Sequence, residues 1–220
     1  MAKAVNSATL SEYSLLHMVL GLTILSGIMT TPAFSMNLYR VGDEIAGESY
    51  NELMQKWLSR NLTVRVGIDE RGQEYMVFIG ETGYGEAAVY VPYNDDEVEP
   101  LKRMLTQSKD WVSVAKHNRA DTDKALGCFP EETFLPCQMS GVPGAENQMG
   151  VRFFATHDGQ LSRLILDLAD QNNRYKRAAI YFDQQGIDKL IKAAQQLGPA
   201  LARAKETARK QHLFDLNKKP

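Results

Sequence analysis

The sequence predicts an α+β fold of two β-β-β-α units, each an antiparallel meander followed by a helix, with one more helix at the C-terminus. Two observations predict these units: runs of alternating apolar and polar residues separated by glycine turns, and apolar residues at helical spacing after each set of strands. The second half repeats the order of the first, which indicates one internal duplication. We expect the first unit at 36–117, a connector at 118–150 and the second unit at 151–220.

The N-terminal stretch has the three parts of a bacterial export signal. Lys3 lies in a short polar start, an apolar run covers 15–29, and the small-residue site is Ala33-Phe34-Ser35. The run is shorter than the roughly 20 residues that a membrane-spanning helix needs. We therefore expect residues 1–35 to be a signal peptide, cleaved near Ser35, and the mature protein to be periplasmic. An uncleaved inner-membrane anchor facing the periplasm is the alternative.

The first unit begins, after a lead-in, with apolar residues at helical spacing in 49–58, so we expect a short amphipathic helix there. Three strands of a meander follow at 62–68, 74–80 and 87–93, joined by the turn-forming DERG and by the glycine turn ETGYGE. Asn94 or Asp95 can then cap a helix, whose first turn is acidic as the helix dipole favours.

The connector predicts a disulfide. The segment DWVSVAK before it reads as an extra strand, and the connector itself as a long loop that contains the only two cysteines, Cys128 and Cys137. An even pair of cysteines in an exported protein usually forms a bridge. We expect this bond to fix the loop.

The second unit predicts strands within 150–156, 161–168 and 177–182, matched to those of the first unit. A helix with Ile187, Leu190 and Leu197 on one side follows them, and Gly198-Pro199 is expected to end that helix and start another. The apolar stripe of this last helix is thin, which predicts weak packing or a site for a partner.

No motif of catalysis is found in the sequence. It has no G-x-S-x-G, H-E-x-x-H or P-loop motif, and two isolated histidines do not make a metal site. The net charge of −2 does not favour general nucleic-acid binding. We therefore expect no catalytic residues, no metal and no cofactor.

These observations favour a non-catalytic periplasmic module that binds or inhibits another envelope or secreted protein, of the immunity or envelope-interaction type. A cell-envelope enzyme such as a peptidoglycan hydrolase is the first alternative. The second is a binder of single-stranded nucleic acid, because repeated meander-plus-helix units are similar in architecture to PUR and Whirly proteins. The candidate partner-binding residues are two charged sets, Asp95, Asp96, Glu97 and Glu99, and Arg203, Lys205, Arg209 and Lys210.

Overall fold

The computed structural model describes residues 36–130, 147–170, 173 and 176–216. These residues form strands, listed here in chain order, and two long helices. The elements are β1 (Met36–Arg40), β2 (Ile45–Asn51), β3 (Lys56–Asp69), β4 (Glu74–Thr82), β5 (Gly85–Pro92), α1 (Asp95–Asn118), β6 (Thr122–Phe129), β7 (Gln148–Thr156), β8 (Leu161–Ala169), β9 (Arg177–Phe182) and α2 (Gln184–Leu216).

The nine strands of the described residues form one antiparallel sheet, in which eight follow the order β5-β4-β3-β2-β9-β8-β7-β6 and β1 pairs with β3 beside this path. The long strand β3 pairs with β2 through its first half and with β1 through its last residues, so that β1 and β2 lie on the same side of it. The two halves of the sheet meet at β2 and β9, which share only the pair Glu48↔Tyr181. A side chain at Gly47 would lie within 3 Å of Ile180 and of the Tyr181 carbonyl, so this meeting of strands requires glycine.

The sheet curls into a half-barrel, and its inner face is the core. Leu62, Val64 and Val66 of β3 show the alternation of inward side chains, and all three are buried. The curl brings β4 against β9: a Cβ on Gly80 would lie 3.0 Å from Ile180 Cδ1, so glycine allows the close approach.

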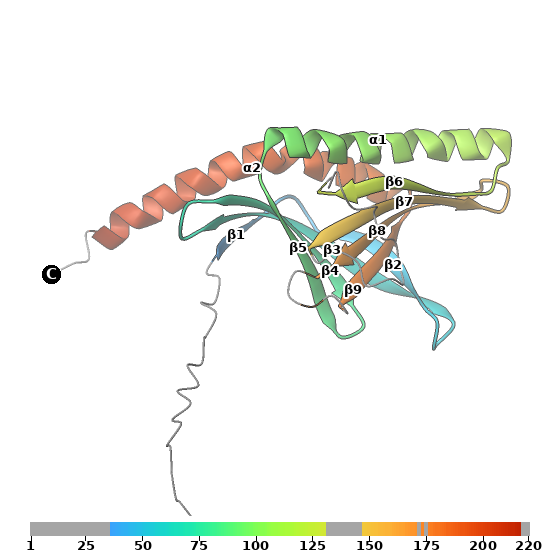
Figure 1. Cartoon of the computed structure of the whole chain (residues 1–220), viewed down its shortest axis with the longest axis horizontal. Helices are drawn as coiled ribbons and strands as arrows, with labels where there is room; N and C mark the ends of the chain where they lie inside the picture. Colours follow the sequence, from blue (N-terminus) through green and yellow to red (C-terminus); the bar gives the residue numbers. More distant parts are fainter. Residues whose placement is uncertain (1–35, 131–146, 171–172, 174–175, 217–220) are drawn as a thin grey trace, which may run out of the picture. The chain divides into compact units, whose positions relative to one another are not determined.

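Two helices cover the inner face of the sheet (Figure 1). Helix α1 buries Val98, Leu101 and Leu105, and α2 buries Leu190 and Leu197 in the same cluster as the strand residues. Burial of apolar surface of this kind stabilises a fold by about 25 cal/mol per Å². The opposite end of the barrel has no helix over it, and there the hairpins β2–β3 and β4–β5 project (Figure 1).

The prediction of an α+β fold with two β-β-β-α repeats is wrong. The chain forms one β-rich curled sheet with two helices, and the two predicted meanders are parts of that sheet. Strands β1, β2 and β6 were not predicted, and they add neighbours that the duplicated plan does not contain. A pattern of local periods indicates strands but carries no information on which sheet they join.

The predicted helix at 49–58 is also wrong. This segment is the end of β2, a turn and the start of β3, paired from Ser49↔Leu58 to Asn51↔Lys56. Asn51 Oδ1 accepts a hydrogen bond from the Met54 N–H at 2.8 Å, and Gln55 adopts a φ of 49°. Cross-strand pairing and turn chemistry therefore outweigh the helical spacing of the apolar residues.

Two further expectations are wrong around α1 and α2. The segment DWVSVAK is the second half of α1, and part of the expected loop 118–150 is the strand β6. Helix α2 continues through Gly198-Pro199 as one helix of 33 residues. Beyond Pro199, Ala200, Leu201 and Ala204 are buried, so this part of the helix is core.

The predicted signal peptide lies outside the described residues, and so does Cys137. Nothing in the described part supports export or a periplasmic location, and both stay predictions. Cys128 is not a free cysteine, but Cys137, its predicted disulfide partner, lies outside the described residues, so the bond between them is not carried further. No helix in the described ranges is long and apolar enough to cross a membrane.

Candidate functional site

A cleft of about 570 Å³ opens at the end of the barrel away from the helices, between the end of β2, the β4–β5 turn and the start of β9. Arg60 of β3 also lines it, beyond the point where β3 and β4 part. The pairing of the two strands ends at Leu62↔Gly80, and from there β3 continues with β2 while β4 continues with β5. At the fork, Glu81 Oε2 accepts the Asn61 N–H at 2.9 Å in place of a backbone carbonyl. We call this space the hairpin cleft. It is lined by Ser49, Tyr50, Asn51, Arg60, Glu81, Thr82, Gly83, Tyr84, Asn173, Lys176, Arg177, Ala178 and Ala179.

The turns of the two hairpins hold large apolar side chains in solvent. In the β2–β3 turn, Leu53 is 93% exposed and Met54 is 57% exposed. In the β4–β5 turn, the Thr82 hydroxyl accepts the Tyr84 N–H at 3.0 Å and donates to the Gly85 carbonyl at 3.1 Å, and Tyr84 is 99% exposed. Exposed apolar groups gathered at one end of a protein mark an interaction surface.

Trp57 fixes the β2–β3 hairpin to the rest of the sheet. Its ring packs edge-to-face on Tyr50, with centroids 5.4 Å apart, and on Tyr181 of β9 at 4.9 Å. Such aromatic pairs contribute about 0.5 to 1.5 kcal/mol beyond the burial of their surface. The hairpin is therefore held in place on one side of the cleft, although Trp57 itself remains half exposed.

The hairpin cleft has a net positive charge, with three cationic side chains and one carboxylate. Arg177 forms a bidentate pair with the buried Asp167, at 3.2 Å and 3.1 Å. Arg60 and Lys176 are only half buried, and neither forms an ion pair with another described residue. The cleft therefore offers two cations to an anionic group of a ligand.

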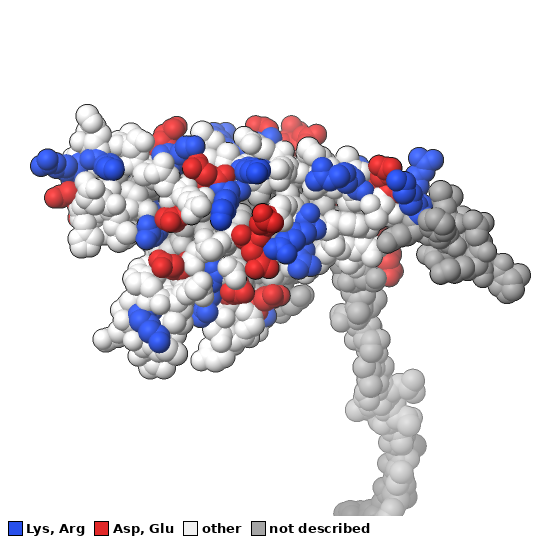
Figure 2. Space-filling view, turned by 180° about the vertical axis from the view of Figure 1, so that it is seen from behind, with Lys and Arg blue, Asp and Glu red and all other residues white. Residues whose placement is uncertain are grey.

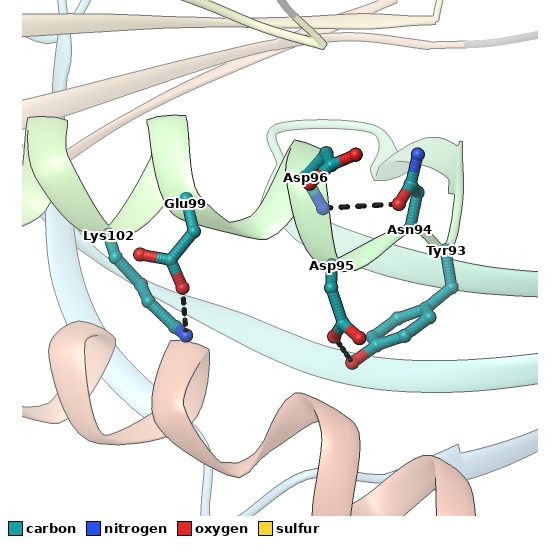
Figure 3. Close-up of polar contacts among 6 residues, drawn as sticks. All are labelled: Tyr93, Asn94, Asp95, Asp96, Glu99 and Lys102. Atoms are coloured by element: carbon teal, nitrogen blue, oxygen red, sulfur yellow. Dashed lines mark hydrogen bonds and ion pairs between the residues drawn. The ribbon is translucent and has the colours of Figure 1, made fainter.

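The predicted acidic set lies in the first turns of α1 (Figure 3), and none of its residues lines the hairpin cleft. Asn94 is the N-cap and accepts the Asp96 N–H at 3.1 Å. Asp95 accepts the Tyr93 hydroxyl at 2.8 Å, and Glu99 pairs with Lys102 at 2.7 Å. Three of the four acidic residues, Asp95, Asp96 and Glu97, lie where negative charge stabilises a helix start. Partner binding by this set stays a prediction.

The predicted basic set lies along the second half of α2, and two of its lysines form ion pairs. Lys205 pairs with Glu74 of β4 at 2.6 Å, and Lys210 pairs with Glu206 of its own helix at 2.6 Å. Lys210 also lowers the pKa of Glu206, through a hydrogen bond and its charge. Arg203 and Arg209 are exposed. Partner binding by these residues also stays a prediction.

Within the described residues, no group of three or more histidine, cysteine, aspartate or glutamate side chains is placed to hold a metal ion. Comparison with protein-family models, with curated proteins and with solved structures found no match.

The hairpin cleft could not be predicted from the sequence, because the apolar spacing of 49–58 predicts a helix, and a helix there would contain neither the hairpin nor its exposed tip. A signal was present: Tyr50 and Trp57 flank a turn containing Asn51, as cross-strand aromatic pairs do in hairpins. The turn at ETGYGE was predicted, and β4 and β5 meet there. The cation Lys176 precedes β9 and reaches the cleft only through the curl of the sheet, which no local pattern indicates.

Proposed function

We propose that this protein is a non-catalytic protein-binding module and that it holds its partner at the hairpin cleft. The observation that carries the proposal is the concentration of exposed large apolar side chains at this end. Four of them, Tyr50, Leu53, Met54 and Trp57, lie within one hairpin, and Tyr84 lies at the tip of the other. Aromatic residues and methionine are enriched at protein interfaces, where their burial supplies most of the binding energy.

The charge distribution favours a protein partner over nucleic acid. On the face seen in Figure 2, Lys and Arg side chains are interspersed with Asp and Glu side chains and form no continuous basic stripe. A nucleic-acid site needs such a stripe to follow the phosphate backbone. The exposed Leu53 and Met54 in the β2–β3 turn also suit a protein surface better than phosphates.

Site-specific photocrosslinking tests the proposal. A photoreactive phenylalanine analogue placed at Tyr84 in the full-length protein, expressed in its native cells, is expected to give a discrete protein adduct. The same analogue at Val114 is the matched control, because Val114 is also an exposed apolar residue but lies on α1. The double substitution Leu53→Ser with Met54→Ser is expected to reduce the adduct from position 84 severalfold, because it removes the apolar anchors of the same surface.

Two outcomes would contradict the proposal. Equal adducts from positions 84 and 114 would show nonspecific contact, and no adduct from position 84 would show that the hairpin cleft is not the interaction surface. An adduct whose added mass is removed by nuclease would instead support the nucleic-acid alternative.

A further inference from the structure

The strands β2 and β9 part inside the hairpin cleft. They meet at the single pair Glu48↔Tyr181. In an antiparallel ladder, the next two residues to exchange backbone hydrogen bonds would be Tyr50 and Ala179, and this pair is not formed. Both residues line the hairpin cleft, so part of the cleft is a wedge between two strands, closed at its inner end by the joint of β2 and β9.

On β2, the main-chain groups of Tyr50 point into this wedge. Alternate residues of a strand direct their N–H and C=O groups to the same edge. The Asn61 N–H of β3 points to Glu81, away from β2, so Leu58 is one of the residues that bond to β2. Its partner there is Ser49, and the next residue, Tyr50, is therefore directed to the other edge, towards β9.

On β9, the main-chain groups of Ala179 point into the wedge from the other side. The Lys176 carbonyl accepts the N–H of Asp170, the residue after β8, at 3.0 Å, and so points towards β8. By the same alternation Ala178 bonds to Leu168 of β8, and Ala179 is directed to β2. Two strands therefore direct N–H groups into one space.

Elsewhere in this sheet, carboxylates accept N–H groups that have no strand partner. Glu81 accepts the Asn61 N–H at 2.9 Å where β3 and β4 part. Asp170 accepts the Ala88 N–H at the free edge of β5, at 3.0 Å. In the wedge between β2 and β9, no described side chain takes this place. A carboxylate brought by a ligand would complete the same pattern there.

The charges around the wedge also favour a carboxylate. Arg60 and Lys176 line the hairpin cleft, and neither forms an ion pair with another described residue. Arg60 Nη1 donates to the Ser59 carbonyl at 3.2 Å, which leaves other N–H groups of the guanidinium for a ligand. Lys176 Nζ reaches the β4–β5 turn, 3.8 Å from the position that a Cβ on Gly85 would take. A carboxylate in the cleft would therefore form charge-assisted hydrogen bonds, which are stronger than neutral ones.

We infer that the hairpin cleft captures the C-terminal carboxylate of the partner protein, which accepts the N–H groups of Tyr50 and Ala179 beside the two cations. This inference rests on the proposed function and deepens it, since it names the part of the partner that the site binds. The wedge is closed at Glu48↔Tyr181, so a chain cannot run through it, whereas a chain end fits it. An N-terminus would bring an ammonium group to the two cations, so the end that fits is the C-terminus.

Amide hydrogen exchange of the full-length protein tests the inference, with acetylated tetra-alanine as the probe. The peptide with a free C-terminus is expected to protect the amides of Tyr50 and Ala179. The same peptide with an amidated C-terminus is expected to give no protection. The amides of Ser49 and Ala178 bond to β3 and β8 and are the internal controls, with little change expected.

Charge variants supply the second readout. Arg60→Gln and Lys176→Gln are each expected to weaken binding of the free-acid peptide about tenfold, because each removes one charge-assisted contact. Lys192→Gln, a change at an exposed lysine of α2, is the matched control and is expected to have no effect.

Mapping of the photocrosslink from position 84 identifies the bound segment of the natural partner. The adduct is expected to contain the partner's C-terminal peptide. An adduct with an internal peptide would overturn the inference and leave the protein-binding proposal standing, whereas no adduct would contradict that proposal itself. The inference is also overturned if the free-acid peptide gives no protection, or if an amidated peptide with one internal aspartate protects as well as the free acid does.

Discussion

Two side chains from the other half of the chain bind the free edge of β5. Asn147 accepts the Tyr90 N–H and donates to the Tyr90 carbonyl, both at 2.6 Å, as a neighbouring strand would do. Asp170, which is buried, accepts the Ala88 N–H at 3.0 Å. Unpaired backbone groups in such a place would cost free energy, so these two side chains satisfy an edge that has no strand partner among the described residues.

Replacing Asn147 is expected to destabilise the protein. Asn147 has a φ of 60°, so Asn147→Gly keeps this backbone conformation while it removes both hydrogen bonds. We expect Asn147→Gly to lower the free energy of unfolding by about 1 to 3 kcal/mol, measured by urea denaturation. Asn147→Ala should cost more, because alanine adds backbone strain. A glycine variant as stable as the wild type would show that the side-chain hydrogen bonds contribute nothing.

Tyr93 is expected to make stability fall at high pH. Burial, and then its hydrogen bond to Asp95, raise the pKa of Tyr93 to about 12. The folded protein therefore holds this proton more tightly than the unfolded chain, whose tyrosines titrate near about 10. The stability that protonated Tyr93 gives to the fold is fully present below a pH of about 10 and is lost as the pH rises through about 12.

Urea denaturation across this range measures the effect. Tyr93→Phe should show a shallower fall of stability with pH than the wild type. Tyr84→Phe is the control, because Tyr84 is almost fully exposed, and it should follow the wild type. Parallel curves for the wild type and Tyr93→Phe would contradict the assignment.

At the scale of elements, the second half of α2 is expected to be essential to the fold. Leu201→Ala should lower the free energy of unfolding by about 2 to 5 kcal/mol, because Leu201 is 2% exposed and its loss leaves a cavity. Arg203 lies two positions further on and is exposed. Arg203→Ala should therefore change the free energy of unfolding by less than about 0.5 kcal/mol. Equal effects of the two substitutions in thermal or urea unfolding would show that this part of the helix is not core.

The elements that the sequence predicts well are those whose signal is local. The hairpins β3–β4 and β4–β5 have glycine turns between alternating runs, and the start of α1 has Asn94 before three acidic residues. Predictions were wrong where contacts between residues far apart in the chain determine the secondary structure. The segment DWVSVAK alternates like a strand, but Trp111 packs on Phe153 of β7 and Ala115 is buried, which keeps the segment in α1. Pro199 signals a helix end, but the buried Leu197 and Leu201 on both sides of it keep α2 continuous.

At the scale of the whole molecule, the candidate site depends on how the sheet is assembled. Arg60 and Lys176 come from distant parts of the chain, and they reach one cleft because β4 and β5 curl over β8 and β9. The sequence gives no sign of this meeting, since Lys176 lies in a short basic stretch at 174–177 and Arg60 is more than 100 residues away from it in the chain. The exposed tips are also invisible to periodicity, because the same apolar residues fit the buried side of a helix.

The single pair Glu48↔Tyr181 between β2 and β9 has a consequence for how the protein folds. On either side of it the chain forms ladders between strands close in sequence, which are quick to assemble because little loop entropy is lost. Joining the halves requires contact between residues far apart in the chain. The slow step of folding is therefore expected to be the docking of two preformed sheets. Until β2 and β9 pair, their edges are open to pairing with other chains. The risk of aggregation is therefore expected to be greatest just before this pairing forms.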